Sequence, residues 1–182
     1  MEPLIHFAVP FAALTALGVK PEFAFLFSLL ALTPDLDVLF HYHRSVSHSL
    51  IPWAICAIPF LGLMPNSQGI NFIILGLVSI ASHMLLDLND YIPILYPLIK
   101  DSYCTNVDFG LHFSSSLNFN LNLRILSEPT TFRYIESLDA QLFTGQGLLI
   151  SLILLTPTLL SILIGISASA MIISKGVFDL EP

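Results

Sequence analysis

Long runs of apolar residues dominate the chain, and five of them approach the length that crosses a bilayer. A membrane-spanning helix needs about 17–25 predominantly apolar residues. The five runs are Pro3–Val19, Phe23–Phe40, Leu50–Met64, Ile70–Leu88 and Gly147–Ile173. The third run is short and contains Pro52 and Pro59, which predicts a tilted or kinked helix. The pattern predicts an all-α membrane fold with about five transmembrane helices.

The pattern changes after the fourth run, because apolar and polar residues alternate strictly from Leu111 to Ile125. A period of two is typical of a half-buried strand, so we expect a β-strand or a hairpin folded at the serines. The stretch Ile92–Ile99 contains two prolines and is too short to span, which favours a re-entrant or interfacial segment. We therefore expect three parts: a four-helix membrane region (1–100), an extramembrane cap that is partly β (100–146), and a C-terminal transmembrane helix with its tail (147–182).

Composition supports a membrane protein. The chain has 182 residues, of which 55% are hydrophobic and only 10% are charged. A soluble domain usually carries about 25% charged residues, because its surface must face water. The formal net charge of −7 also opposes nucleic-acid binding, which requires a basic surface. We expect an integral membrane protein with no nucleic-acid partner.

The few basic residues bear on orientation, because cytoplasmic loops carry an excess of Lys and Arg. With the N-terminus inside, four basic residues fall in inner loops and two in outer loops. The inner ones are Arg44, Lys100, Arg124 and Arg133, and the outer ones are Lys20 and Lys175. This bias leans toward a cytoplasmic N-terminus in a multi-pass protein of the inner (cytoplasmic) membrane.

Ionisable residues gather at particular ends of the apolar runs. A charged residue at the bilayer centre costs roughly 2.5–3.5 kcal/mol on insertion scales, so such residues invite a functional interpretation. Successive spans cross the membrane in opposite directions. One membrane face therefore holds the start of the first span, the end of the second, the start of the third and the end of the fourth. The residues at these ends are His6, Asp35, Asp37, His41, His43, His48, His83 and Asp87. Topology alone predicts that they converge, and the charge bias places them on the cytoplasmic side.

The residue types suit a metal ion. His83 and Asp87 are four residues apart and share one face of a helix. Asp35 and Asp37 follow Pro34, where an interrupted helix would let both carboxylates turn toward one site. Imidazole with carboxylate is a ligand set for zinc, manganese or iron. We expect a divalent metal centre of one or two ions, zinc or manganese favoured, held by His6, Asp35, Asp37, His48, His83 and Asp87, with His43 as a further candidate.

Each of these features also has a simpler explanation. His6 is compatible with a hydrogen-bonded residue at the membrane interface. Asp35 and Asp37 are compatible with a solvated turn at a helix end. His83 and Asp87 are compatible with a buried hydrogen-bonded pair. Arg44 has the forked geometry that binds phosphate. It equally suits a positive-inside anchor, or a counter-ion to the carboxylates at 35 and 37. Ser47 or Ser49 suits the cap of the third helix.

Three ordered motifs resemble those of the YdjM-like membrane-bound metal-dependent hydrolases. They are Leu32–Asp37 (LTPDLD), His43–Ser49 (HRSVSHS) and Ser82–Asp87 (SHMLLD). The family patterns are P-D-x-D, H-R-G-x-T-H-S and S-H-x-x-x-D, after an N-terminal His and before a proline-rich stretch that Ile92–Leu98 matches. In this chain Ser45 replaces the usual Gly and Ser47 the usual Thr. The resemblance covers about residues 1–100 and implies a metal site in a prokaryotic membrane more strongly than it implies a substrate.

The favoured function is hydrolysis of a phosphoester in a lipid or lipid-linked substrate at the membrane face. Arg44, Asp35 and His43 are the predicted catalytic residues. Arg44 is expected to hold the phosphate, and one of the carboxylates or a metal-bound hydroxide to act as base. We expect the cap to lie over the site and select the substrate. The alternative is that it is only an amphipathic strand at the membrane interface. A metal or proton transport or binding protein could use the same His/Asp cluster, and a scaffold whose polar residues only join helices is a third possibility.

Overall fold

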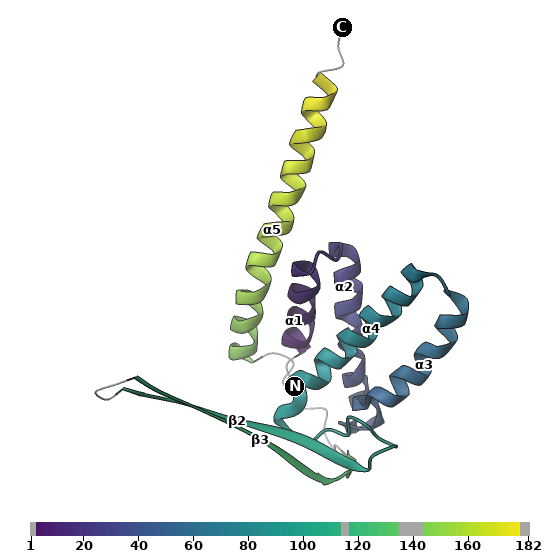
Figure 1. Ribbon diagram of the computed structural model, residues 1–182, viewed down its shortest axis with the longest axis vertical. Helices are drawn as coiled ribbons and strands as arrows, with labels where there is room; N and C mark the ends of the chain where they lie inside the picture. Colours follow the sequence, from purple (N-terminus) through teal and green to yellow (C-terminus); the bar gives the residue numbers. More distant parts are fainter. Residues whose placement is uncertain (1–2, 114–116, 135–143, 179–182) are drawn as a thin grey trace. The chain divides into compact units, whose positions relative to one another are not determined.

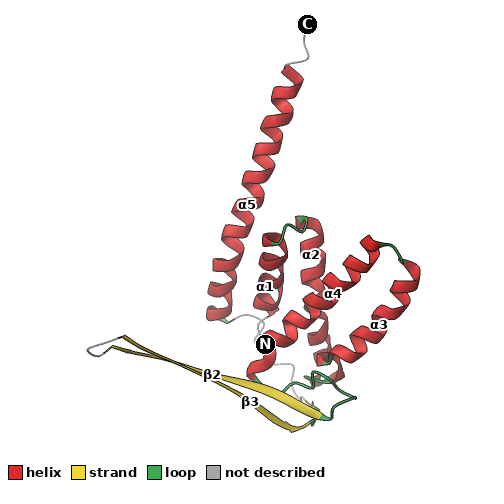
Figure 2. Ribbon diagram, in the orientation of Figure 1, coloured by secondary structure: helices red, strands yellow, loops and turns green. Residues whose placement is uncertain are grey.

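The structure is a computed structural model, and it describes residues 3–113, 117–134 and 144–178. The α-helices of this part are α1 (Pro3–Ala16), α2 (Pro21–Leu30), α3 (Leu50–Leu63), α4 (Ser67–Leu86) and α5 (Gly145–Phe178) (Figure 1). The 3-10 helices are η1 (Thr33–Phe40), η2 (Val46–His48) and η3 (Asp87–Asn89). The strands are β1 (Tyr42–His43), β2 (Asp101–Phe113), β3 (Leu117–Pro129) and β4 (Arg133–Tyr134). The chain is therefore mostly helical, with a small antiparallel β component (Figure 2).

In the part of the chain that the structure describes, three helical segments are long and apolar enough to cross a membrane. They are Pro21–Phe40, Ser67–Asn89 and Gly145–Gly165. These three segments confirm the prediction that the chain has transmembrane helices. The helices α1 and α3 are apolar but have only 14 residues each, so the count of five spans stays a prediction.

The chain divides into two compact units, and the larger one contains the described residues between 29 and 134. In this unit α3 and α4 pack as a helical hairpin (Figure 1). A small core joins Ile80 and Met84 of α4 to Ile92 in the segment after it, and Leu50 and Trp53 of α3 pack against that core. The rest of α3 has no buried residue, which is the pattern of a helix whose apolar surface faces lipid.

A long β-hairpin belongs to the same unit. Strands β2 and β3 pair antiparallel in a continuous register from Asp101↔Pro129 to Phe113↔Leu117. The turn at the serines, 114–116, lies outside the described residues. The predicted hairpin is confirmed, and its strands begin about ten residues before the strict alternation does. Two shorter strands, β1 and β4, form a second antiparallel pair.

The other unit contains the described residues 3–28 and 144–178. Its helices α1 and α5 pack against each other. The ring of Phe7 in α1 meets the ring of Phe25 in α2 edge-on, with centroids 5.4 Å apart. The helix α5 has 34 residues and is therefore about 51 Å long, more than the hydrocarbon core requires.

Candidate metal centre

The first carboxylates of the site come from a 3-10 helix rather than from the end of an α-helix. The α-helix α2 ends at Leu30, and η1 follows from Thr33 with Pro34 in its first turn. Proline has no N–H to continue the α-helical ladder, and the chain winds more tightly after it. Asp35 and Asp37 are both largely buried in this turn.

The short helix η2 positions His48, whose side chain is fully buried. The connection before it makes a sharp turn, with Arg44 in the left-handed region at φ 57°. Ser45, which replaces the glycine of the family pattern, has an ordinary extended backbone at φ −81°. The substitution therefore costs no backbone strain at that position.

The last turn of α4 supplies the other two residues. His83 and Asp87 are one helical turn apart, and His83 Nε2 lies 3.7 Å from Asp87 Oδ2. Asp87 also ends the helix as its C-cap residue. Both side chains are buried, so this end of α4 presents a polar pair inside an otherwise apolar helix.

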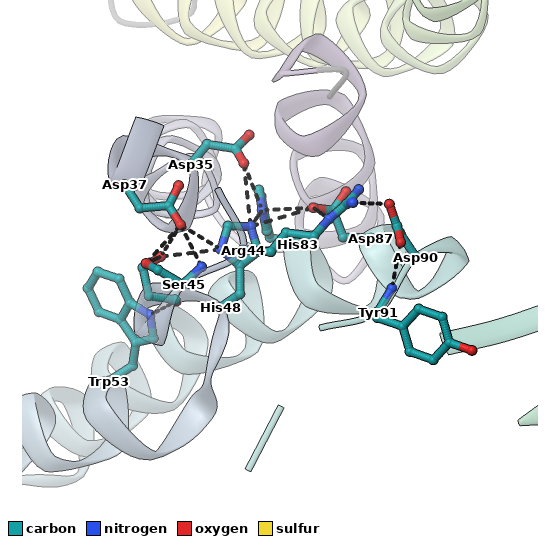
Figure 3. Close-up of polar contacts among 11 residues, drawn as sticks. Asp35, Asp37, Arg44, Ser45, His48, Trp53, His83, Asp87, Asp90 and Tyr91 are labelled. Carbon is teal, nitrogen blue, oxygen red and sulfur yellow. Dashed lines mark hydrogen bonds and ion pairs between the residues drawn. The ribbon is translucent and has the colours of Figure 1, made fainter. Parts of the chain in front are cut away.

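Four side chains from these three segments converge, and we name Asp35, His48, His83 and Asp87 the four-residue cluster. One ligand atom from each lies within 4.8 Å of all the others. Asp35 Oδ1 is 3.5 Å from His48 Nε2 and 3.4 Å from His83 Nε2, and the two imidazole nitrogens are 3.3 Å apart (Figure 3). Asp87 Oδ2 is 3.5 Å from His48 Nε2.

This arrangement fits a divalent metal ion. Tetrahedral zinc with bonds of 2.0–2.1 Å separates its ligand atoms by about 3.3–3.4 Å, close to the distances in the four-residue cluster. Asp35 Oδ1 faces the two imidazole nitrogens, whereas the buried Oδ2 has no hydrogen bond among the described residues. A buried carboxylate oxygen in that state is costly, and a cation would relieve the cost. Two imidazoles and two carboxylates are also the donor set of zinc, manganese or iron sites.

Asp37 contacts the opposite side of His48. Its Oδ2 lies 3.3 Å from His48 Nδ1, whereas the cluster contacts reach Nε2. The same oxygen accepts hydrogen bonds from the backbone N–H and hydroxyl of Ser45 and from the hydroxyl of Ser47, each at 2.9 Å. A carboxylate only accepts, so the Nδ1 that faces it must carry a hydrogen, and Nε2 is left to face the cluster.

Arg44 lies at the edge of the cluster. Its guanidinium pairs with Asp90, and its Nε is 3.9 Å from Asp87 Oδ2 (Figure 3). The carboxylates that it contacts therefore follow α4, and they are not the two in η1. The guanidinium is only partly buried, so it connects the cluster with the surface.

The surrounding carboxylates set the charge of His48 in the metal-free protein. Burial alone would lower the pKa of this imidazole, but contacts with Asp35, Asp37 and Asp87 outweigh burial and raise the pKa from 6.5 to about 10. His48 is therefore protonated at neutral pH when no metal ion is bound. Metal binding has to displace this proton.

The remaining predicted residues have other placements. His6 is buried in α1, in the other unit. His43 pairs through its backbone with Arg133 in β1 and β4, and its side chain lies outside the described residues. The sequence therefore pointed to all four cluster residues, while the roles assigned to His6, Asp37, His43 and Arg44 stay predictions.

Some supporting contacts were not predicted. The indole N–H of Trp53 donates to the Ser47 carbonyl at 2.7 Å and so holds the η2 turn. An indole N–H inside an apolar helix needs an acceptor. The single tryptophan in an apolar run was therefore the one feature of the sequence that could have indicated this contact. Ser49 caps α3 by accepting from the Ile51 N–H, and it also donates to the Tyr96 carbonyl at 2.6 Å. Capping by Ser49 is one of the two options that the sequence left open.

Comparisons with known proteins agree with this picture. The sequence model of the YdjM inner membrane protein family matches residues 1–171. No curated protein and no solved structure matches the chain. The match runs through both units and includes all four cluster residues.

Proposed function

Because the chain belongs to the YdjM inner membrane protein family, we propose that it is an integral membrane metal-dependent hydrolase that cleaves a phosphoester of a lipid or lipid-linked substrate. The four-residue cluster is the observation that carries this proposal. His48, His83 and Asp87 are buried and Asp35 is largely buried. The four residues come from the ends of two candidate spans and the turn between them. A purely structural contact would not require two carboxylates and two imidazoles at ligand distances.

Each residue has a proposed role. Asp35, His48, His83 and Asp87 would hold a divalent ion, zinc or manganese, and a bound ion would supply Lewis-acid chemistry toward a phosphoryl oxygen. The Oδ2 oxygen of Asp35 has no hydrogen-bond partner in the described part of the chain, and it is the proposed acceptor for the proton of the attacking water. A bond forms between phosphorus and the water oxygen while the ester P–O bond breaks. Asp35 then gives the proton it accepted to the leaving oxygen, so the products are an alcohol and a phosphate.

Arg44 is the proposed phosphate-binding residue. A guanidinium binds a phosphate through two parallel hydrogen bonds, and this one lies beside Asp87 and is partly exposed. Asp90 holds the guanidinium in place until an anionic substrate competes for it. His43 remains a candidate catalytic residue from its motif.

The proposed arrangement in the membrane has five crossing helices and a cytoplasmic site. The exposed apolar surface of α3, including Ile55, Ile58 and Leu63, supports a position in lipid for this short helix. The orientation rests on the bias of basic residues toward the loops on the side of the cluster.

Metal analysis and turnover test the function. The purified protein is expected to contain a divalent ion and to hydrolyse at least one member of a panel of phospholipids and artificial phosphoesters. His83→Gln and Asp87→Asn should lose both metal and turnover, whereas the matched controls His112→Gln and Asp101→Asn, outside the cluster, should keep both. A protein without any divalent ion contradicts the metal centre. Metal flux into proteoliposomes without turnover contradicts the hydrolase and supports transport.

A further inference from the structure

The β2–β3 hairpin has one apolar face that no other described part of its own unit covers. The register places Val107 opposite Leu123 and Phe109 opposite Leu121, so apolar residues pair with apolar residues. Val107, Leu121, Leu123 and Ile125 have 55%, 56%, 63% and 67% of their surface exposed. The intervening positions pair Asn106 with Arg124 and Asp108 with Asn122, which makes the other face polar.

An exposed face of this kind is unfavourable in water. Strands of 13 residues extend about 40 Å, and a two-stranded hairpin alone is marginally stable at best. Among its described side chains, the buried ones lie at the root of the hairpin, the end next to η3, and they are Ser102 and Cys104. From Asn106 outward the described side chains of both strands are exposed, so the outer hairpin needs a surface that covers its apolar face.

The root fixes the level of the hairpin relative to the membrane. The candidate span Ser67–Asn89 ends in η3, and β2 packs against η3. The Thr105 hydroxyl donates to the Leu88 carbonyl at 3.1 Å, and Ile92 and Tyr103 exchange two backbone hydrogen bonds of 3.0 and 2.9 Å. The hairpin therefore begins where a membrane-crossing helix ends, which is the boundary between hydrocarbon and water.

We infer that the hairpin lies in the membrane–water interface, with Val107, Leu121, Leu123 and Ile125 among the lipid acyl chains and its asparagine face in water. A strand pair with open edges cannot cross the hydrocarbon, because its unpaired backbone groups would lose water. An amphipathic element at this level lies in the plane of the interface instead. The inference depends on the membrane location of the chain and does not require hydrolase activity.

Charge indicates which attraction holds the hairpin to lipid. Residues 101–134 contain three acidic side chains, Asp101, Asp108 and Glu128, and two basic ones, Arg124 and Arg133. A segment with this balance has no basic cluster to attract anionic lipids. Burial of apolar side chains is therefore the driving force, and a zwitterionic bilayer suffices.

Fluorescent labels at single cysteines test the inference in the full chain. The variants are made in a Cys56→Ser, Cys104→Ser background, labelled with an environment-sensitive dye, and reconstituted into phosphatidylcholine vesicles. The apolar-face positions are Val107, Leu121, Leu123 and Ile125, and their neighbours on the polar face serve as controls at Asn106, Asp108, Asn122 and Arg124. Apolar-face labels should shift to shorter wavelength and lose emission to quenchers carried on lipid chains. Polar-face labels should lose emission to aqueous iodide.

The alternation along the strand makes the result decisive. Each label replaces one side chain. If emission wavelength and quenching alternate from one residue to the next along each strand, the strands are intact and one of their faces contacts lipid. Equal iodide quenching at all eight positions overturns the inference. Apolar-face labels shielded from both quenchers, with disulfide cross-linking of Leu123→Cys between chains, would assign the face to a second copy instead. A signal that requires anionic lipid or disappears in high salt overturns the apolar mechanism.

Discussion

His48 is held between carboxylates on both of its ring nitrogens. Asp37 faces Nδ1, and Asp35 and Asp87 face Nε2. The ring can rotate only if it breaks contacts on both sides, and it has no exposed surface. This restraint determines which nitrogen points toward His83.

Asp37 should act as a positioning residue for metal binding. Asp37→Ala removes the acceptor for His48 Nδ1 and for both serines, and we expect metal affinity to fall by about 10–100-fold, as for other partners of ligating histidines. The number of ions at saturation should not change. Asp35→Ala removes a ligand and should lower that number. Competition with a chelating dye measures both quantities, with Asp101→Ala as an exposed control.

Equal metal affinity in Asp37→Ala and the unmodified protein would contradict the positioning role. A loss of the bound ion in Asp37→Ala as complete as in Asp35→Ala would instead make Asp37 a ligand. The two variants therefore separate the two possible functions of the P-D-x-D motif in this chain.

The pH dependence of the metal-free protein should follow His48. Its pKa is raised from 6.5 to about 10 in the folded state, so the folded chain holds this proton more tightly than the unfolded chain does. The resulting stabilisation is fully present below pH 6.5 and is lost as the pH rises toward 10. Thermal unfolding of metal-free protein across this range should show a falling midpoint, and His48→Gln should flatten the profile while His112→Gln keeps it. An unchanged slope in His48→Gln would assign the effect to other groups.

At the scale of elements, Ser49 joins the start of α3 to the segment 92–99. Its hydroxyl caps the helix and also donates to the carbonyl of Tyr96, and it is completely buried. In addition, the Leu50 N–H donates to the Ile94 carbonyl. The proline-rich stretch is thus bound to the turn that carries His48.

Ser49→Ala should destabilise this junction. Loss of an N-cap costs about 0.5–2 kcal/mol, and a buried carbonyl left without its donor adds to that cost. We expect a lower denaturation midpoint with unchanged metal content, because Ser49 contacts no cluster residue in the described hydrogen bonds. Ser161→Ala on the exposed side of α5 is the matched control and should have little effect. A loss of metal in Ser49→Ala would show that the junction also shapes the site.

At the scale of the whole molecule, the short helices determine the number of crossings. A helix of 14 residues is about 21 Å long, whereas the hydrocarbon core is about 30 Å thick. Local thinning of the bilayer can accommodate such helices at modest cost. We therefore expect α1 and α3 to cross together with the three longer segments.

Cysteine labelling from each side of oriented vesicles tests the crossings of the segments before α5. With five crossings, Leu17→Cys and Pro65→Cys should react on one face, and Glu2→Cys and Asp101→Cys on the other. Reaction of Leu17→Cys on the same face as Glu2→Cys would show that α1 does not cross. Reaction of Pro65→Cys on the same face as Glu2→Cys, with Leu17→Cys on the other face, would show that α3 does not cross.

The sequence by itself determined the features that depend on local periodicity. Uninterrupted apolar runs indicated membrane helices, and alternation from Leu111 to Ile125 indicated a hairpin, because helices and strands repeat at different periods. The spacing of His83 and Asp87 placed them on one helix face. Antiparallel succession of the spans also predicted the convergence of residues that the structure brings together in the four-residue cluster.

Only the tertiary structure decided which atoms meet. Asp35 and Asp37 are two residues apart, and in a 3-10 helix of three residues per turn such side chains leave the axis on different sides. One therefore reaches Nε2 of His48 and the other reaches Nδ1. The partners of Arg44 were equally hidden, because Asp87 and Asp90 lie more than forty residues away along the chain. Sequence patterns report local periodicity, whereas such contacts depend on how separate segments pack.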